Sequence, residues 1–387
     1  MNDAKKLFPI FRNEKGLVYL NTAASAQKPD LVIDGMAGFM RENYANIHRG
    51  LYPLAMRANR IYDEARARAA RFINAEPDEI VFAKNATEAI NLAASQLRPG
   101  DTVITTEAEH HSNMLPWMKS GAKVKFMPIF GNGEPDYGWL EKNIAGARIV
   151  AMSGQSNVLG LRNDIGRAAA IAHSAGAKIL VDAAQMIVHH GLDVCASDID
   201  FAAFSGHKIY GPTGIGVLYG RRALLESMEP WQVGGDTIET ASLEGAKYLA
   251  PPMRFEAGTQ PLAEAHGLAL AMDFMNEFGI NRIERASAEL SGYARALLSE
   301  IKGIRIISHP ESNGIITFAA DGISPFDIGA MLGAKNICAR AGLHCAEPLH
   351  KRLGIEGSVR ISIGLYNDKP DIDAFAKGLR EVLHALA

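Results

Sequence analysis

The chain has 387 residues, of which 48% are hydrophobic and 21% charged, a balance typical of soluble globular proteins. The 40 basic and 43 acidic residues give a net charge of -3, which offers no electrostatic reason to expect nucleic acid or an anionic membrane as a partner. No apolar run approaches the ~20 residues of a membrane span, and the first residues lack the apolar core of an export signal. Three cysteines cannot form a disulfide framework, so we expect a cytoplasmic protein. The length predicts two domains.

The first two thirds of the chain predict an α/β domain in which strands and helices alternate. Two helical patterns, over 31–44 and 54–73, come first. Strands are then expected at 79–83, 102–106, 124–129, 148–152, 178–181, 199–204 and 216–219, with helices at 87–96, 113–120 and 165–175. This alternation predicts a mostly parallel seven-stranded sheet with helices on both faces.

The rest of the chain predicts a long connection and a smaller domain. Residues 228–261 are rich in Gly and Pro without a clear period, so a long functional loop is expected there. Helices over 263–277 and 282–301 lead into strands at 305–307, 315–319, 337–340 and 359–363 and a helix over 372–386. We expect a large domain over 18–275 and a smaller α+β domain over 276–387, to which the N-terminal segment 1–17 is attached.

An acid and a lysine follow two of the apolar strands. Asp182 ends the run at 178–181, and Lys208 stands in the polar cluster SGHK that follows the run at 199–204. Ligands of parallel sheets collect at the carboxyl ends of the strands, so both side chains should reach one crevice. Pyridoxal phosphate requires such a pair, an amine for a Schiff base and an acid facing the pyridine nitrogen. The alternative is a strand-end acid and an unrelated surface lysine.

Further polar loops follow the other strands. The segment Lys84–Glu88 precedes a helix and is suited to a phosphate, although taken alone it is better explained as an ordinary capped helix. His110 and His111 follow the next strand; one of them could stack on a flat cofactor ring, and no third ligand is spaced for a metal site. Asn157 is either a donor to a ring oxygen or a turn residue.

The smaller domain contributes a thiol and an arginine. Cys345 lies in the loop RAGLHC beside His344, which suits a mobile, exposed and reactive thiol, whereas Cys338 lies within an apolar strand pattern. Arg360 stands inside a strand pattern, where a buried guanidinium needs an anion. That anion is either a substrate carboxylate or the carboxylate of a structural salt bridge.

In this order the motifs resemble the cysteine desulfurases of the class V aminotransferase family (fold type I), and specifically their group II or SUF-type branch. The resemblance runs through most of the chain, in the segments YLNTAASAQKP, NIHRG, NATEAIN, EAEHHSNMLPW, SNVLG, VDAAQ, FSGHKIYGPTGIGVLY, RFEAGT, RAGLHCAEPL and VRIS. It departs from the family at GTQPL (258–262), where GTPN is usual, and at RAGLHC, where R-[TS]-G-H-H-C is frequent.

The resemblance implies a homodimeric enzyme that uses pyridoxal phosphate to convert L-cysteine to L-alanine. It implies that Lys208 forms the Schiff base and that Asp182 faces the ring nitrogen. His110 would stack on the ring and handle protons, and Gln185 and Asn157 would contact the ring oxygen. The phosphate ligands would be Ala86, Thr87, Ser205, His207 and, from a second subunit, Thr259.

By the same resemblance, Arg360 binds the substrate carboxylate, assisted by Asn157 and Arg340. Cys345 would accept the sulfur as a persulfide and pass it to an acceptor protein for iron–sulfur cluster assembly. The alternatives on the same scaffold are a selenocysteine lyase that acts on L-selenocysteine, a cysteine sulfinate desulfinase and another C–S lyase. A non-enzymatic sulfur-transfer partner is the alternative from a different class.

Overall fold

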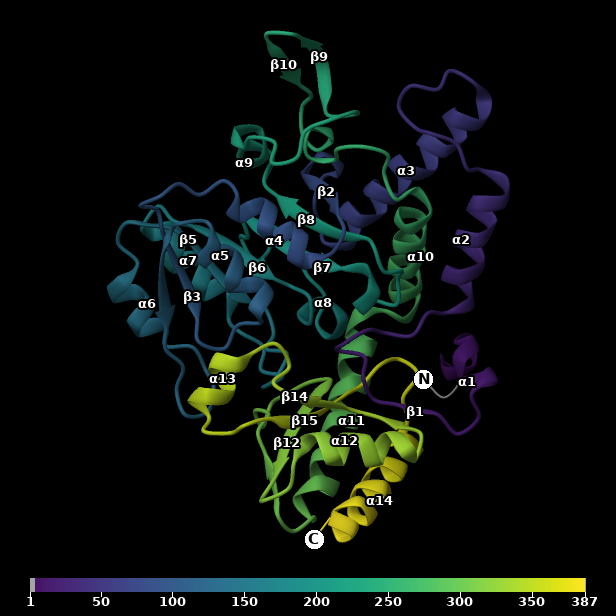
Figure 1. Ribbon diagram of the computed structural model, residues 1–387, viewed down its shortest axis with the longest axis vertical. Helices are drawn as coiled ribbons and strands as arrows, with labels where there is room; N and C mark the ends of the chain where they lie inside the picture. The colour runs from purple at the N-terminus through teal and green to yellow at the C-terminus, as the bar shows by residue number, and fades with distance from the viewer. Residues whose placement is uncertain (1–3, 387) are drawn as a thin grey trace.

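The computed structural model describes residues 4–386, and its largest element is a sheet of seven strands (Figure 1). In sheet order the strands are β2 (Ile80–Ala83), β8 (Gly216–Gly220), β7 (Phe201–Ser205), β6 (Lys178–Asp182), β5 (Ala147–Ser153), β3 (Thr102–Thr106) and β4 (Lys123–Met127). Strand β8 is antiparallel to both its neighbours, and the pairs from β7 to β4 are parallel. The predicted mostly parallel seven-stranded sheet is therefore confirmed.

Helices cover both faces of this sheet because its central strands are apolar on both sides. Side chains alternate along a strand, so Ile179 and Val181 enter one core cluster while Leu180 enters another. The first cluster receives residues from α2 (Asp30–Glu42), α3 (Pro53–Phe72), α6 (Tyr137–Asn143), α7 (Ile165–Ser174), α8 (Met186–His189) and α10 (Leu262–Phe278). The second receives residues from α4 (Ala86–Ala94), α5 (Leu115–Lys119) and α9 (Arg222–Ser227).

A smaller C-terminal domain is built on a second, antiparallel sheet. Its strand order is β11 (Ile304–Ile306), β12 (Ile315–Ala320), β15 (Ser358–Ser362) and β14 (Arg340–Gly342). Its core includes residues of α11 (Ile280–Ser299), α12 (Pro325–Ala334) and α14 (Lys369–Leu386), while α13 (Glu347–Arg352) lies beside the large domain. The turn from α10 into α11 uses Gly279 at φ 77°, a conformation that favours glycine. The predicted boundary at 275/276 falls within the last turn of α10.

The N-terminal segment contacts both domains. Helix α1 (Pro9–Asn13) follows Phe8, a fully buried ring that packs against Tyr210, Phe274 and Tyr366. Strand β1 (Val18–Tyr19) then pairs in parallel with β13 (Ile337–Cys338). The predicted single strand over 337–340 is therefore wrong, because Ile337 and Cys338 pair with β1, whereas Arg340 begins a separate strand, β14, which pairs with β15.

The predicted loop at 228–261 contains regular structure. Strands β9 (Ile238–Ser242) and β10 (Gly245–Tyr248) form an antiparallel hairpin that projects at the top of Figure 1. Nearly all its side chains are exposed, so its sequence lacks the hydrophobic alternation by which a half-buried strand is recognised.

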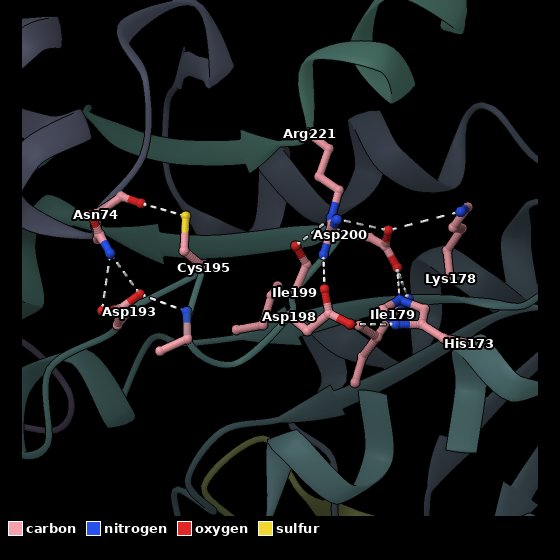
Figure 2. Close-up of polar contacts among 11 residues, drawn as sticks. Asn74, His173, Lys178, Ile179, Asp193, Cys195, Asp198, Ile199, Asp200 and Arg221 are labelled. Carbon is pink, nitrogen blue, oxygen red and sulfur yellow. Dashed lines mark hydrogen bonds and ion pairs between the residues drawn. The ribbon is translucent and has the colours of Figure 1, made fainter. Parts of the chain in front are cut away.

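A network of charged groups ties the strands together at the end opposite their polar loops (Figure 2). His173 of α7 lies between two carboxylates, with Nδ1 2.9 Å from Asp198 and Nε2 2.7 Å from Asp200. Arg221, which follows β8, contacts both acids, and the backbone N–H of Ile179 in β6 donates to Asp200 at 2.9 Å. The network thus fixes β6, β7 and β8 relative to one another.

No helix between residues 4 and 386 is both long and apolar enough to cross a membrane.

Candidate active site

A cavity of about 200 Å³ lies at the carboxyl ends of the large-sheet strands, where the smaller domain meets them. Its lining includes every site residue predicted from the sequence except Cys345 and Thr259. The residues brought together are Ala86, Thr87, His110, Asn157, Asp182, Gln185, Ser205, His207 and Lys208 from the large domain and Arg340 and Arg360 from the smaller one. Thr259 lies instead in another cavity, which Lys84, Glu88 and Trp231 also line.

Lys208 and Asp182 enter the cavity from adjacent strands. Asp182 is the last residue of β6, and Lys208 ends the short helical turn that follows β7. Burial lowers the pKa of Lys208 to about 8, although the carboxylate of Asp182 acts in the opposite direction. Burial raises the pKa of Asp182, opposed by Lys208 and by a hydrogen bond from the Ala184 N–H at 3.0 Å. The lysine can therefore exchange its proton near neutral pH.

One corner of the cavity is suited to a phosphate. Helix α4 begins there, capped by the Asn85 side chain, which accepts from the N–H of Glu88 at 3.0 Å. The N–H of Ala86 donates to the Ser205 hydroxyl at 2.9 Å, and the Thr87 hydroxyl lies 2.8 Å from that of Ser112. Backbone donors and hydroxyls at the positive end of a helix are favourable ligands for an anion.

His110 is a neutral ring held at the wall of the cavity. Its Nδ1 accepts from the N–H of Ser112 at 3.1 Å, which places the proton of the neutral ring on Nε2. Burial, followed by the charge of Lys208, lowers the pKa of His110 to about 3. The neighbouring Glu109 is buried and accepts from Thr106 and Asn113, each at 2.7 Å. These bonds anchor the loop that carries the histidine.

Two arginines face each other across β14 and β15. Arg340 and Arg360 are directly paired in the ladder, and burial lowers the pKa of Arg360 to about 9, with the charge of Arg340 adding to the effect. Arg360 is only 1% exposed, and its Nη1 donates to the carbonyl of Asn157 at 2.9 Å. Within residues 4–386 its Nε and Nη2 have no hydrogen-bond partner. Like charges opposite each other destabilise a sheet, so this arrangement calls for an anion in the cavity.

Cys345 lies next to this arginine pair. Its Sγ is 3.6 Å from Nη2 of Arg340, and its carbonyl accepts from the N–H of His111 at 2.7 Å. The Asn157 side chain donates to the carbonyl of His344 at 2.7 Å. The thiol is half-buried, so the predicted exposed cysteine is wrong in this respect, because these bonds hold its loop against the large domain.

Several residues of the site were not predicted from the sequence. Ser153, Gln155 and His344 line the cavity, and the buried Glu109 directly precedes His110 in the chain. Ser153 was identifiable, since it ends β5 opposite Asp182 in the register. No described cysteine is part of the cavity lining, and unlike Cys345 the other two have no hydrogen bond with an arginine of the site. Cys338 is half-buried and Cys195 is exposed, with its Sγ 3.1 Å from the carbonyl of Asn74 (Figure 2).

The chain is similar to known proteins over nearly its whole length. A probable cysteine desulfurase of Halalkalibacterium halodurans is 42% identical over 98% of this chain and 97% of its own. A cysteine desulfurase of Dickeya dadantii is 41% identical over 97% of this chain and 95% of its own. The solved apo cysteine desulfurase of Thermococcus onnurineus has a TM-score of 0.95 at 36% identity, with 100% of this chain and 98% of that chain covered.

The solved Escherichia coli cysteine desulfurase CsdA has a TM-score of 0.93 at 38% identity and covers 100% of this chain, with 99% of its own chain covered. A family model, that of aminotransferase class-V, matches residues 18–375. The fold is the one found in these solved relatives, and the polar cavity lies within the residues that the family model matches. This chain belongs to the aminotransferase class-V family.

Proposed function

We propose that the protein is a cysteine desulfurase that converts L-cysteine to L-alanine and receives the sulfur on Cys345. The observation that carries the proposal is the thiol 3.6 Å from Arg340, at the edge of a cavity that holds a buried lysine, a buried acid and an arginine with unpartnered donors. The relatives named as cysteine desulfurases, at 42% and 41% identity over nearly full length, support it.

Pyridoxal phosphate is the cofactor of this family, and the residues of the cavity fit it. Its phosphate would lie at the first turn of α4 with Ala86, Thr87, Ser205 and His207. Asp182 would face the ring nitrogen, and the neutral ring of His110 would stack on the cofactor. Oε1 of Gln185 is buried and without a partner among the described residues, and would accept from the ring hydroxyl. When bound, the cofactor supplies an electron sink for a carbanion at the substrate Cα.

Lys208 would hold the cofactor covalently and then act on a proton. Its pKa of about 8, lowered by burial, leaves part of the amine neutral near pH 7.5. A neutral Nζ released by the substrate would take the Cα proton and later return one. Arg360, with Arg340 beside it, would bind the substrate carboxylate. This contact would place the substrate's side chain toward Cys345.

The sulfur step moves one atom without a separate oxidant. The Cys345 thiolate attacks the sulfur of the bound substrate, so an S–S bond forms as the substrate's C–S bond breaks. The electron pair of the broken bond stays with carbon, which is protonated to give the methyl group of alanine. In sum, one thiol and one cysteine give one persulfide and one alanine.

The sulfur acceptor, the cellular compartment and the oligomeric state are parts of the same proposal. A small acceptor protein would take the sulfur from Cys345 for iron–sulfur cluster assembly, and the enzyme would act in the cytoplasm as a homodimer. Thr259 would then reach the partner's phosphate site, which agrees with its place outside the cavity of its own chain. The group II assignment and a preference for L-cysteine over L-selenocysteine are parts of the proposal.

The deciding experiment is the Cys345→Ser variant given L-cysteine. It should keep the cofactor but release almost no alanine, whereas the wild type should gain about 32 Da, one sulfur atom, on the peptide that contains Cys345. Cys195→Ser is the matched control and should behave as wild type. Full alanine production by Cys345→Ser would refute the proposal and favour a lyase that needs no thiol. Activity confined to L-selenocysteine or cysteine sulfinate would identify one of the related enzymes.

A further inference from the structure

A series of hydrogen bonds links the residues on either side of Cys345 through side chains that the proposed chemistry does not use. Nε2 of His344 lies 3.0 Å from the hydroxyl of Ser358, and the same hydroxyl lies 2.9 Å from Nε2 of His350. Nδ1 of His350 lies 3.0 Å from the carbonyl of Ala346. The chain of bonds therefore begins on the residue before Cys345 and ends on the residue after it.

The direction of each bond follows from the chemistry of the groups. A carbonyl only accepts, so Nδ1 of His350 carries a proton and donates to Ala346. Its Nε2 is then the acceptor of a neutral ring, and the Ser358 hydroxyl donates to it. The oxygen of Ser358 accepts in turn from Nε2–H of His344, whose Nδ1 has no partner among the described residues. Thus His344 donates to Ser358, Ser358 donates to His350, and His350 donates to the carbonyl of Ala346.

All three side chains are buried, which keeps both rings neutral. His344 is 2% exposed, and His350 and Ser358 are fully buried. Burial lowers the pKa of His344 to about 2 and also lowers that of His350. Water cannot replace a broken bond in this interior, so the loss of one partner leaves the others unsatisfied.

The chain of bonds acts on a strained segment of backbone. His344 and Cys345 both have positive φ, 50° and 55°, which is costly for residues other than glycine. Ser358 starts β15 directly opposite Gly342 in the ladder, and Arg360 is two residues further along the same face. One strand thus carries both the hydroxyl that holds the cysteine loop and the guanidinium that faces the cavity.

We propose that Ser358 and His350 are positioning residues, which keep His344 and Cys345 in this backbone conformation and so hold the thiol beside Arg340. The inference rests on the proposed function only in taking Cys345 as the reactive thiol. Neither residue needs to touch substrate or cofactor. Without them the loop would relax, the half-buried thiol would become more accessible, and its alignment for attack would be lost.

The test is Ser358→Ala in the full-length holoenzyme, with the alkylation of each cysteine by iodoacetamide followed by peptide mapping. We expect Cys345 to react at least about fivefold faster while kcat for alanine falls about tenfold, an effect on the scale of one hydrogen bond. KM should change less than about twofold, because Arg360 remains in place. Exposed Cys195 serves as the internal reference and should react at an unchanged rate.

Three further variants separate positioning from general damage. Ser358→Thr retains the hydroxyl and should restore both the slow alkylation and the higher kcat. Ser287→Ala removes another buried serine–histidine bond, 3.1 Å to His189, and should change neither measurement. His350→Asn keeps a donor for Ala346, but its shorter side chain places no acceptor where Nε2 of His350 meets Ser358, so Cys345 should again be alkylated faster than in the wild type. This variant replaces Ser358→Ala as the test if Ser358→Ala fails to fold.

The proposal is overturned if Ser358→Ala leaves the alkylation of Cys345 at the wild-type rate, or if Ser287→Ala produces the same change. Alkylation is measured without substrate, so it decides the question even if Cys345→Ser retains full activity. In that case the proposed function fails, while the positioning of the thiol stands or falls on the alkylation rates alone.

Discussion

Nδ2 of Asn157 donates to the backbone carbonyl of His344 at 2.7 Å, and this bond joins the turn that follows β5 in the large domain to the loop that carries Cys345. The carbonyl of the same asparagine accepts from Arg360. One residue of the large domain therefore holds both the thiol loop and the guanidinium of the smaller domain. We predicted from the sequence that Asn157 contacts the cofactor or the substrate; the structure shows that one N–H of its amide is used within the chain.

Replacing Asn157 with alanine should lower kcat rather than the cofactor content. The change leaves a buried carbonyl without its donor, at a cost of about 1–3 kcal/mol. We expect about a tenfold loss of kcat in the alanine assay and a normal visible spectrum. If instead the cofactor is lost while the activity per bound cofactor stays normal, the main role of Asn157 is the ring contact.

Asp182→Asn should bind the cofactor and lose most of its activity. The amide cannot stabilise a positive charge at the ring nitrogen, and every ~1.4 kcal/mol lost slows the reaction tenfold. Turnover of L-cysteine and the visible spectrum, measured together, separate loss of chemistry from loss of binding. Near-normal turnover would show that a charge at this position is not needed.

Arg360→Gln should raise KM for L-cysteine and lower kcat/KM about 100-fold, which corresponds to ~2.7 kcal/mol. Arg360→Lys keeps the charge but lacks the forked donors, and we expect it to recover only part of the loss. Arg380→Gln, which changes an exposed arginine on α14, is the control. Unchanged KM in Arg360→Gln would assign the substrate carboxylate to another group.

The buried pair of Arg66 and Glu256 should stabilise the fold strongly against the loss of one partner. Two guanidinium nitrogens contact Glu256 at 2.7 Å each, and its carboxylate also accepts from Tyr62 at 2.9 Å and from the Phe82 N–H at 2.7 Å. Glu256→Gln should lower the free energy of unfolding by about 3–5 kcal/mol in urea, because it leaves the arginine charge unpaired.

The exposed pair of Lys335 and Glu381 offers the comparison for that measurement. Glu381→Gln should leave the urea midpoint unchanged within error. A loss of stability in Glu381→Gln as large as that in Glu256→Gln would contradict the importance of burial.

The protein should become less stable as the pH falls below ~6.5, the usual pKa of histidine. Burial lowers the pKa of His189 to about 3, so this ring stays neutral in the folded state while the unfolded chain takes up a proton. The unfolded state then binds more protons, and the free energy of unfolding decreases as the pH falls toward 3.

His189→Asn should reduce that slope, by up to about 1.4 kcal/mol per pH unit, in urea unfolding curves recorded between pH 7 and pH 4.5. The exposed His384 provides the control, since its replacement by Asn should leave the slope unchanged. Equal slopes in wild type and His189→Asn would show that this ring does not resist protonation.

The sequence predicted those parts of the fold that depend on local pattern. Strands β6 and β7 are apolar runs buried on both faces, and the polar residues that end them reach one cavity. Given a parallel sheet, the common location of Asp182, Lys208 and Ser205 follows from topology alone. The chemical roles of these residues stay predictions until the variants above are measured.

The remaining features depend on contacts between distant segments, which leave no periodic signal. The break between β13 and β14 exists because β1, more than half the chain away, pairs with Ile337 and Cys338. The bonds around Cys345 join residues 344, 350 and 358 through a loop, a helix and a strand. The half-buried state of the thiol also depends on His111 and Asn157, which belong to the other domain.

The position of β15 has a consequence for the order in which the protein can mature. It is the last strand in chain order among residues 4–386, yet it lies between β12 and β14 in the small sheet. Before it emerges from the ribosome, β14 has no neighbour in that sheet, and neither Ser358 nor Arg360 can take its place in the site. Lys208 and Asp182 are complete long before, so a nascent chain would be able to capture the cofactor well before it could ever release sulfur. The part of the site that would receive sulfur is therefore completed after the part that would hold the cofactor.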